Sequence, residues 1–159
     1  MGKLLVGMVA LMGVTAQADV AVDINLSAQR AYLTENGRVI ASTPIASGRR
    51  SHPTPRGHFR IIEKDRHHRS TLYGRVLNRH GRVVNGDASS GDPVPRGGRF
   101  VAAPMPYFMR FRGPAGMHAG HLPGYAASHG CVRLPHQAAQ FFFHNVQIGT
   151  PVRVFGRAP

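Results

Sequence analysis

The stretch SHGCVRL, residues 128–134, contains the one cysteine of this 159-residue chain. Cys131 follows His129 and Gly130, and His118 lies thirteen residues before it. A cysteine attacks as its thiolate, so a nucleophilic cysteine needs a base or a positive charge beside it. A glycine just before the cysteine lets backbone N–H groups approach a developing oxyanion. The stretch therefore predicts a nucleophilic cysteine assisted by histidine.

Two histidines are candidates for the base. His118 precedes a loop with glycine and proline, residues 121–127, which is long enough to fold back onto the thiol. We expect His118 to take the proton, and we expect His129 and Ser128 to orient the loop through hydrogen bonds. A nearby imidazole is expected to lower the pKa of the Cys131 thiol below its ordinary value of about 8.5.

Two other interpretations of these residues stay open at this point. His118, His121, His129 and Cys131 are of the types that ligate zinc, although their spacing matches no common zinc motif and no acidic residue accompanies them. The cysteine could also be a packing residue, because a free cysteine behaves as a small apolar side chain. Its polar and small neighbours weaken that interpretation.

The N-terminus has the pattern of a secretory signal. Lys3 precedes an apolar stretch, residues 4–14, and a small-residue Ala-Gln-Ala sequence ends at position 18. The apolar stretch is far shorter than the roughly 20 residues that cross a bilayer. We therefore expect a signal peptide over residues 1–18 and a single domain over residues 19–159. An exported protein usually carries its cysteines in pairs, so a lone Cys131 favours a reactive thiol.

The charge of the chain is strongly positive. Twenty basic residues stand against seven acidic ones, which gives a net charge of +13. Such a surface attracts polyanions. The basic residues are dispersed and no nucleic-acid-binding motif is present, so we expect an anionic substrate of the cell envelope and no nucleic acid.

Most of the chain shows strand patterns. Alternating residues predict a strand at 20–27, and the Asn36-Gly37 pair predicts a hairpin. Further strands are expected at 58–64 and 150–155, a second hairpin around residues 79–81, and a long loop over residues 85–99. One helix is expected after the cysteine, with Pro135 at its first position and Ala138, Phe142 and Val146 facing the core. Many short strands and one helix predict a mainly β fold, either a sandwich or a partly closed barrel.

The stretch at 128–134 resembles the signature of the L,D-transpeptidase catalytic domain family, which is of YkuD type. Members of this family are cysteine enzymes of the bacterial cell wall. The segments LSAQRAYL, PIASGRR and TPRGHFRI resemble the N-terminal β region of that family in the same order. One difference is that Ala119 separates the first histidine from Gly120. The residues that match the family pattern are His118, Ser128, His129, Gly130, Cys131 and Arg133.

The resemblance implies a mechanism and a fold. Cys131 would attack the third residue of a peptidoglycan tetrapeptide stem, release D-Ala and leave a thioester, which an amine of a second stem would convert to a 3→3 cross-link. Arg133 would bind a carboxylate of the stem or, equally, brace the loop. The resemblance implies no metal and no cofactor, and a β-sandwich or partly closed barrel with one short helix after the motif. The signal pattern predicts no stable membrane insertion and an exported enzyme, in the periplasm or the cell wall.

Other outcomes of the same thioester remain open. Water as the acceptor would make an L,D-carboxypeptidase, and a protein lysine would make a lipoprotein-anchoring transpeptidase. A different class is a cationic wall-binding module without catalytic activity. The sequence does not separate these alternatives.

Overall fold

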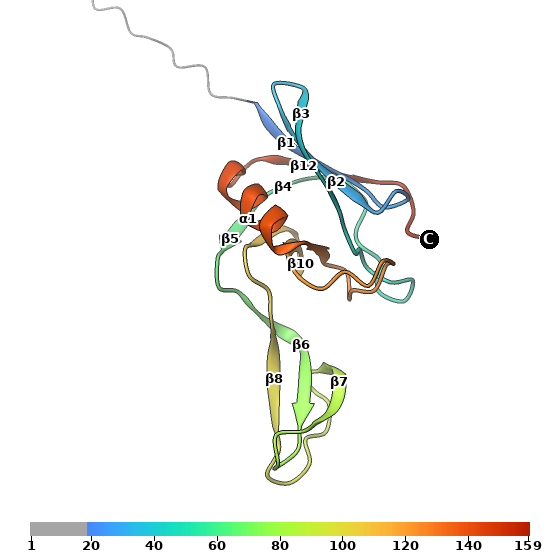
Figure 1. Ribbon diagram of the computed structural model, residues 1–159, viewed down its shortest axis with the longest axis vertical. Coiled ribbons are helices and arrows are strands. Elements are labelled where there is room, and N and C mark those ends of the chain that lie inside the picture. The colour runs from blue at the N-terminus through green and yellow to red at the C-terminus, as the bar shows by residue number, and fades with distance from the viewer. Residues whose placement is uncertain (1–18) are drawn as a thin grey trace, which may run out of the picture.

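The computed structural model describes residues 19–159, so the predicted signal peptide lies outside the described residues. The described chain consists of a body built on two sheets and an arm that projects from it (Figure 1). Within this part of the chain, no helix combines the length and the apolar character that crossing a membrane requires.

The first sheet of the body has the strand order β3-β2-β1-β12-β4. Alternate residues of these strands point inward, and Val22, Ile24 and Leu33 are completely buried. Asn36 and Gly37 both have positive φ, so the predicted hairpin between β2 and β3 is confirmed. The five strands are β1 (Val20–Asn25), β2 (Arg30–Glu35), β3 (Arg38–Pro44), β4 (Gly57–Arg60) and β12 (Pro151–Phe155).

The second sheet of the body has the order β11-β10-β9-β5 and faces the same core. Its β10 strand is buried along its whole length, because neighbouring strands and the helix α1 (His136–Asn145) surround it. The strands β10 and β11 run parallel, which places His118 opposite Arg133. The four strands are β5 (Glu63–Asp65), β9 (Phe108–Arg112), β10 (Ala115–Ala119) and β11 (Val132–Leu134).

The arm is the third sheet, with the order β7-β6-β8. It consists of β6 (Arg69–Leu77), β7 (Val83–Ser89) and β8 (Arg99–Pro104). The main core, as far as the structure describes it, contains no residue of the arm. The arm buries only a few small apolar side chains of its own, chiefly Val76, Leu77 and Ala88. Figure 1 shows the start of β6 close to the body and its end far from it.

The mainly β fold with one helix after the cysteine is confirmed, and the sheets stay open instead of closing into a barrel. Pro135 is the residue just before the helix rather than its first helical residue. Phe142 and Val146 are fully buried as expected, and Ala139 rather than Ala138 is the buried alanine.

Two predicted boundaries were wrong. The expected strand at 58–64 is divided, because the chain leaves the first sheet at Ile61 and joins the second at Ile62. The N–H of Ile61 donates to the carbonyl of Thr150, whereas the N–H of Ile62 donates to the carbonyl of Arg110. The expected loop at 85–99 is also shorter, because β7 continues to Ser89. Strands β8 to β11 were not predicted.

Candidate active site

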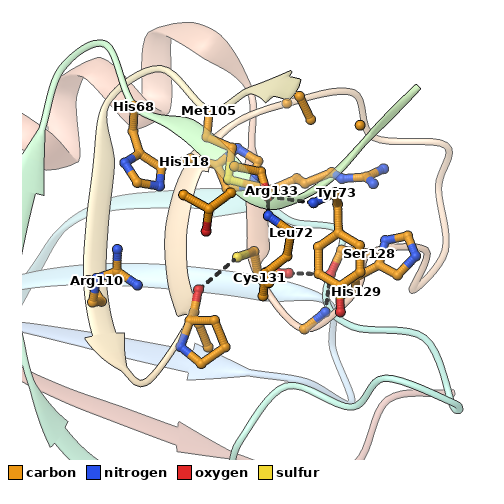
Figure 2. A pocket seen from close by; sticks show the side chains of 18 of the residues that line it. His68, Leu72, Tyr73, Met105, Arg110, His118, Ser128, His129, Cys131 and Arg133 are labelled. Carbon is orange, nitrogen blue, oxygen red and sulfur yellow. Dashed lines mark hydrogen bonds between the residues drawn. The ribbon is translucent and has the colours of Figure 1, made fainter. Parts of the chain in front are cut away.

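A cavity of about 570 Å³ lies at the meeting point of three parts of the chain. They are residues 128–131, named the nucleophile loop for the predicted role of Cys131, the turn between β9 and β10, and the base of the arm. The cavity is lined by all six residues that the sequence singled out, namely His118, Ser128, His129, Gly130, Cys131 and Arg133. Figure 2 shows Tyr73 of the arm and Arg110 of β9 together with the side chains of His118, Ser128, His129, Cys131 and Arg133. Residues separated by up to 60 positions in the sequence therefore share one cavity.

The loop that carries Cys131 is held by hydrogen bonds on both sides. Ser128 Oγ accepts from the Gly130 N–H at 3.1 Å and donates to the carbonyl of Cys131. Thr54 Oγ1 donates to the Gly130 carbonyl at 2.9 Å and accepts from the Gly48 N–H at 2.8 Å. Gly130 has φ +115°, a conformation that favours glycine.

These bonds change one expectation about the oxyanion. The N–H of Gly130 already bonds Ser128 Oγ, so it is not free to hold an oxyanion in the resting site. The N–H of Cys131 has no hydrogen-bond acceptor among residues 19–159, which leaves it free to donate to an oxyanion formed at this residue.

Gly48 must be a glycine for this loop to form. A Cβ on Gly48 would lie 2.1 Å from the His52 carbonyl oxygen and 3.0 Å from the Gly130 Cα. The segment that follows β3 therefore passes in close contact with the nucleophile loop. Two isolated bridges, between Ala46 and Arg133 and between Gly48 and Ser128, fix that contact.

The thiol of Cys131 lies against the carbonyl oxygen of Pro114, with 3.6 Å between sulfur and oxygen. Burial raises the pKa of the Cys131 thiol, and the Gly116 N–H and the charges of Arg110 and Arg133 offset this only in part. The lowered pKa expected from the sequence is therefore wrong for the resting site. Desolvation of the thiolate outweighs the nearby positive charge.

His118 is buried in β10, with 5% of its surface exposed. Its Nδ1 lies 2.8 Å from the carbonyl oxygen of Ala119, so Nδ1 carries the proton and Nε2 has a free lone pair. Burial lowers the pKa of His118 to about 4, and the charge of Arg133 acts in the same direction. At neutral pH the site therefore holds a neutral thiol and a neutral imidazole.

His129 faces the arm. Its Nε2 lies 2.8 Å from an Arg49 guanidinium nitrogen and 3.2 Å from Asp87 Oδ1, and its ring stacks on Tyr73 at 4.1 Å between centroids. Arg49 also forms an ion pair with Asp87 at 2.9 Å. Burial lowers the pKa of His129, and the carboxylate of Asp87 only partly opposes this.

Arg49, Tyr73 and Asp87 are site residues that the sequence analysis missed. Asp87 was assigned to a long loop, and Arg49 was part of the segment PIASGRR without a role in the site. No local pattern marks them, because they meet His129 across 80, 56 and 42 positions of sequence. Only the way the arm sits on the body brings them together.

Arg133 lines the cavity without a partner for its guanidinium in the described chain. Its side chain runs close over Gly120, where an added Cβ would lie 3.0 Å from Arg133 Cγ. Arg110, by contrast, is held by Glu63 at 2.6 Å and by the Gly113 carbonyl at 2.9 Å. Arg133 is therefore available to a ligand, as is Arg112, an exposed cavity arginine whose side chain also has no hydrogen-bond partner in the described chain.

The zinc interpretation receives no geometric support from the residues that prompted it. Among residues 19–159, the one group of three potential ligands close together is Glu63, Asp65 and His68. Glu63 is paired with Arg110, and Asp65 with His68. His118, His129 and Cys131 do not converge on a common point, because His129 points to the arm.

The sequence matches the family model described as YkuD, L,D-transpeptidase catalytic domain, over residues 19–154. The chain belongs to this family. L,D-transpeptidase 1 of Mycobacterium tuberculosis is 27% identical over 139 residues, which are 83% of this chain and 49% of that protein. The chain thus spans about half the length of this curated relative.

Solved structures of L,D-transpeptidases have a similar fold. One from Xylanimonas cellulosilytica is 26% identical, with a TM-score of 0.64 over 89% of this chain and 62% of the other. An L,D-transpeptidase in complex with imipenem is 25% identical, with a TM-score of 0.64 over 87% of this chain and 59% of the other. The L,D-transpeptidase family suggested by residues 128–134 is confirmed.

Proposed function

We propose that this chain is an L,D-transpeptidase that acts on peptidoglycan tetrapeptide stems through a thioester on Cys131. The observation that carries the proposal is the placement of a free thiol, the neutral buried imidazole of His118 and the unpaired guanidinium of Arg133 around a single cavity. The family match supports the reaction class.

The first step forms the thioester. His118 Nε2 takes the proton of the Cys131 thiol as the sulfur attacks the carbonyl carbon of the third stem residue. The N–H of Cys131 donates to the oxyanion of the tetrahedral intermediate. The intermediate collapses with cleavage of the bond to D-Ala, and His118 returns the proton to the leaving amine.

The second step transfers the acyl group. An amine of a neighbouring stem attacks the thioester carbonyl and loses its proton to His118. The carbon–sulfur bond breaks, the thiol is restored, and a 3→3 cross-link remains. His129 and Ser128 act through the loop: Ser128 braces its backbone, and His129 connects it to the arm.

Arg133 binds a carboxylate of the stem in this proposal. A planar guanidinium matches a carboxylate with two parallel hydrogen bonds. The alternative, in which Arg133 braces the loop with its side chain, lacks support, because its guanidinium has no hydrogen bond to the described residues. The protein would act after export, in the periplasm or cell wall, where this substrate lies.

The decisive experiment incubates the purified protein with a disaccharide tetrapeptide and identifies the products by mass spectrometry. We expect loss of D-Ala, a covalent adduct on Cys131 and a 3→3 linked dimer. Imipenem, which one solved relative binds, should add a single adduct at Cys131. The variant Cys131→Ser should give no thioester and no dimer.

The products also separate the alternatives. A tripeptide without dimer would show that water is the acceptor and would contradict cross-linking. Absence of any adduct from a folded protein would contradict the enzyme and support a wall-binding module.

A further inference from the structure

The far half of the arm carries uncompensated positive charge. We define the arm tip as residues 75–84 and 93–99, which contain no acidic residue. Its arginines are all exposed and have no carboxylate partner in the described chain: Arg75, Arg79, Arg82, Arg96 and Arg99. The two carboxylates of the arm lie outside the tip and are engaged, Asp87 by Arg49 and Asp92 by Asn85 and Ser89.

The fold brings these arginines together. Leu77 of β6 pairs with Val83 of β7 on one side and with Arg99 of β8 on the other, so these three residues lie side by side across the sheet. A Cβ on Gly97 would lie 3.2 Å from the Cβ of Arg79, which shows that the two connecting loops touch. Figure 1 shows this end of the arm far from the body. The positive charge is therefore concentrated at the end of the arm, where no residue of the body competes for a binding partner.

Apolar side chains are exposed among the arginines. Val83, Val84 and Val94 have 51%, 55% and 43% of their surface exposed. Val83 and Val84 are neighbours in β7 at a register irregularity, where Val83 pairs with Leu77 and Asn85 with Val76. The arm does not need them for its own packing, which relies on Val76 and Leu77. The arm tip therefore has arginines that can bind anions and exposed valines whose burial in an apolar environment is favourable.

An anionic lipid bilayer fits both properties. Arginine binds phosphate groups with several hydrogen bonds, and valines gain from entering the boundary between headgroups and acyl chains. A soluble polyanion would satisfy the arginines and leave the valines in water. Strand β6 continues from Tyr73, which stacks on His129 of the body, to Leu77, so the tip extends roughly 13 Å beyond that contact.

We propose that the arm tip is a peripheral docking surface for an anionic lipid bilayer. Docking would be reversible and would hold the cavity, which lies at the base of the arm, at a distance from the membrane. The proposal goes beyond the transpeptidase reaction and does not depend on it.

The absence of tryptophan from the chain allows a single fluorescent reporter. We compare Val84→Trp at the tip with Val39→Trp on β3 of the body, because the two valines are similarly exposed at 55% and 59%. On addition of phosphatidylglycerol/phosphatidylcholine vesicles, the emission of Val84→Trp should shift to shorter wavelength. The emission of Val39→Trp should not shift, and pure phosphatidylcholine should affect neither.

A second measurement tests the arginines by vesicle co-sedimentation at fixed salt. Each arginine near an anionic surface contributes about fivefold to binding, so Arg79→Gln/Arg82→Gln/Arg96→Gln should lose about hundredfold. The control Arg38→Gln/Arg50→Gln/Arg157→Gln removes the same charge from exposed sites on the body and should lose much less. All variants share one N-terminus, so residues 1–18 contribute equally to each.

Three results would overturn the proposal. Equal losses in the two triple variants would show that only net charge matters. A shift for Val39→Trp as large as that for Val84→Trp would show unspecific adsorption. Binding of soluble polyglutamate through the tip, without binding of vesicles, would identify a polymer as the partner. Acylation of a soluble tetrapeptide should be unchanged in the tip variant, which separates this test from that of the reaction.

Discussion

Desolvation shifts the pKa values of Cys131, which is half-buried, and of His118, which is buried in β10, away from their ordinary values. Burial disfavours the thiolate at Cys131 and the imidazolium at His118, so the pKa of the thiol is raised and the pKa of the imidazole is lowered. A thiolate–imidazolium pair would require the opposite shifts. In the proposed reaction, the proton would therefore leave the sulfur during the attack, because the resting site does not hold a thiolate.

Alkylation of Cys131 should reflect this. With iodoacetamide, a neutral reagent, the rate should rise with an apparent pKa above the ordinary value of about 8.5, because burial raises the pKa of the thiol. The same protein in denaturant should show the ordinary value. A plateau of fast alkylation between pH 5 and pH 7 would instead reveal a thiolate–imidazolium pair.

His118 should make the folded protein sensitive to acid. Its pKa is about 4 when folded and 6.5 in the unfolded chain, so the unfolded state binds the extra proton first as the pH falls. The contribution of His118 to the free energy of unfolding is fully present above pH 6.5 and is lost as the pH falls towards 4. The loss at pH 4 is on the order of 3 kcal/mol. Denaturant titrations at pH 7 and pH 4 should show this loss for the native chain. The loss should be smaller by that amount in His118→Gln, and an equal loss in both would contradict the low pKa.

Arg133→Lys tests the substrate contact. We expect KM for the tetrapeptide to rise roughly tenfold, since a charged hydrogen bond is lost, with little change in the melting temperature. Gly120→Ala should act in the same direction, because its Cβ would lie 3.0 Å from Arg133 Cγ and displace the side chain. A lower melting temperature with an unchanged KM would show that Arg133 braces the loop.

At the scale of elements, the arm and the nucleophile loop are coupled through a small polar cluster. Asp87 of β7 contacts both Arg49 and His129, and Tyr73 of β6 stacks on the same imidazole. The arm shares no part of the main core in the described residues, so these contacts hold its base against the site.

Asp87→Asn should therefore slow acylation of Cys131 with little loss in the stability of the protein. The Asp87 side chain is 60% exposed, and an exposed ion pair contributes about 0.2–1 kcal/mol, so we expect acylation to be about two- to fivefold slower. Asp92→Asn is the matched control, because Asp92 bonds only to Asn85 and Ser89 within the arm. Equal acylation rates in the two variants would mean that the cluster does not position His129.

At the scale of the whole molecule, the body and the arm differ in how they are stabilised. The body buries a continuous core between two sheets and a helix, whereas the arm is a three-stranded sheet with little buried apolar surface. A three-stranded sheet is stable on its own only when it buries a hydrophobic face, and the arm buries few apolar side chains. The arm is thus suited to contacts with other molecules, and the body to holding the reacting groups.

Export predicts a processed chain. If residues 1–18 are a signal peptide, the intact mass of the exported protein should correspond to a chain that begins at or near Asp19. Asp19 directly precedes β1, and its N–H donates to Asn36 Oδ1, so the first described residue is already part of the fold. Recovery of a membrane-bound protein that retains Met1 would contradict this prediction.

The sequence by itself determined the features that depend on neighbours in the chain. The hairpin at Asn36-Gly37 forms because both residues tolerate positive φ, and the helix begins after Pro135 because proline suits a helix start. The grouping of Ser128, Gly130 and Cys131 in one loop is likewise local. These features follow from backbone preferences that act over a few residues.

Only the tertiary structure decided the rest. The change of sheet between Ile61 and Ile62 depends on partners about 50 to 90 positions away, and the contact of Asp87 with His129 spans 42. The raised pKa of Cys131 depends on burial, which no short segment reveals. The sequence placed imidazoles near the thiol, which favours a thiolate, but the fold removed water from it, and desolvation proved the stronger effect.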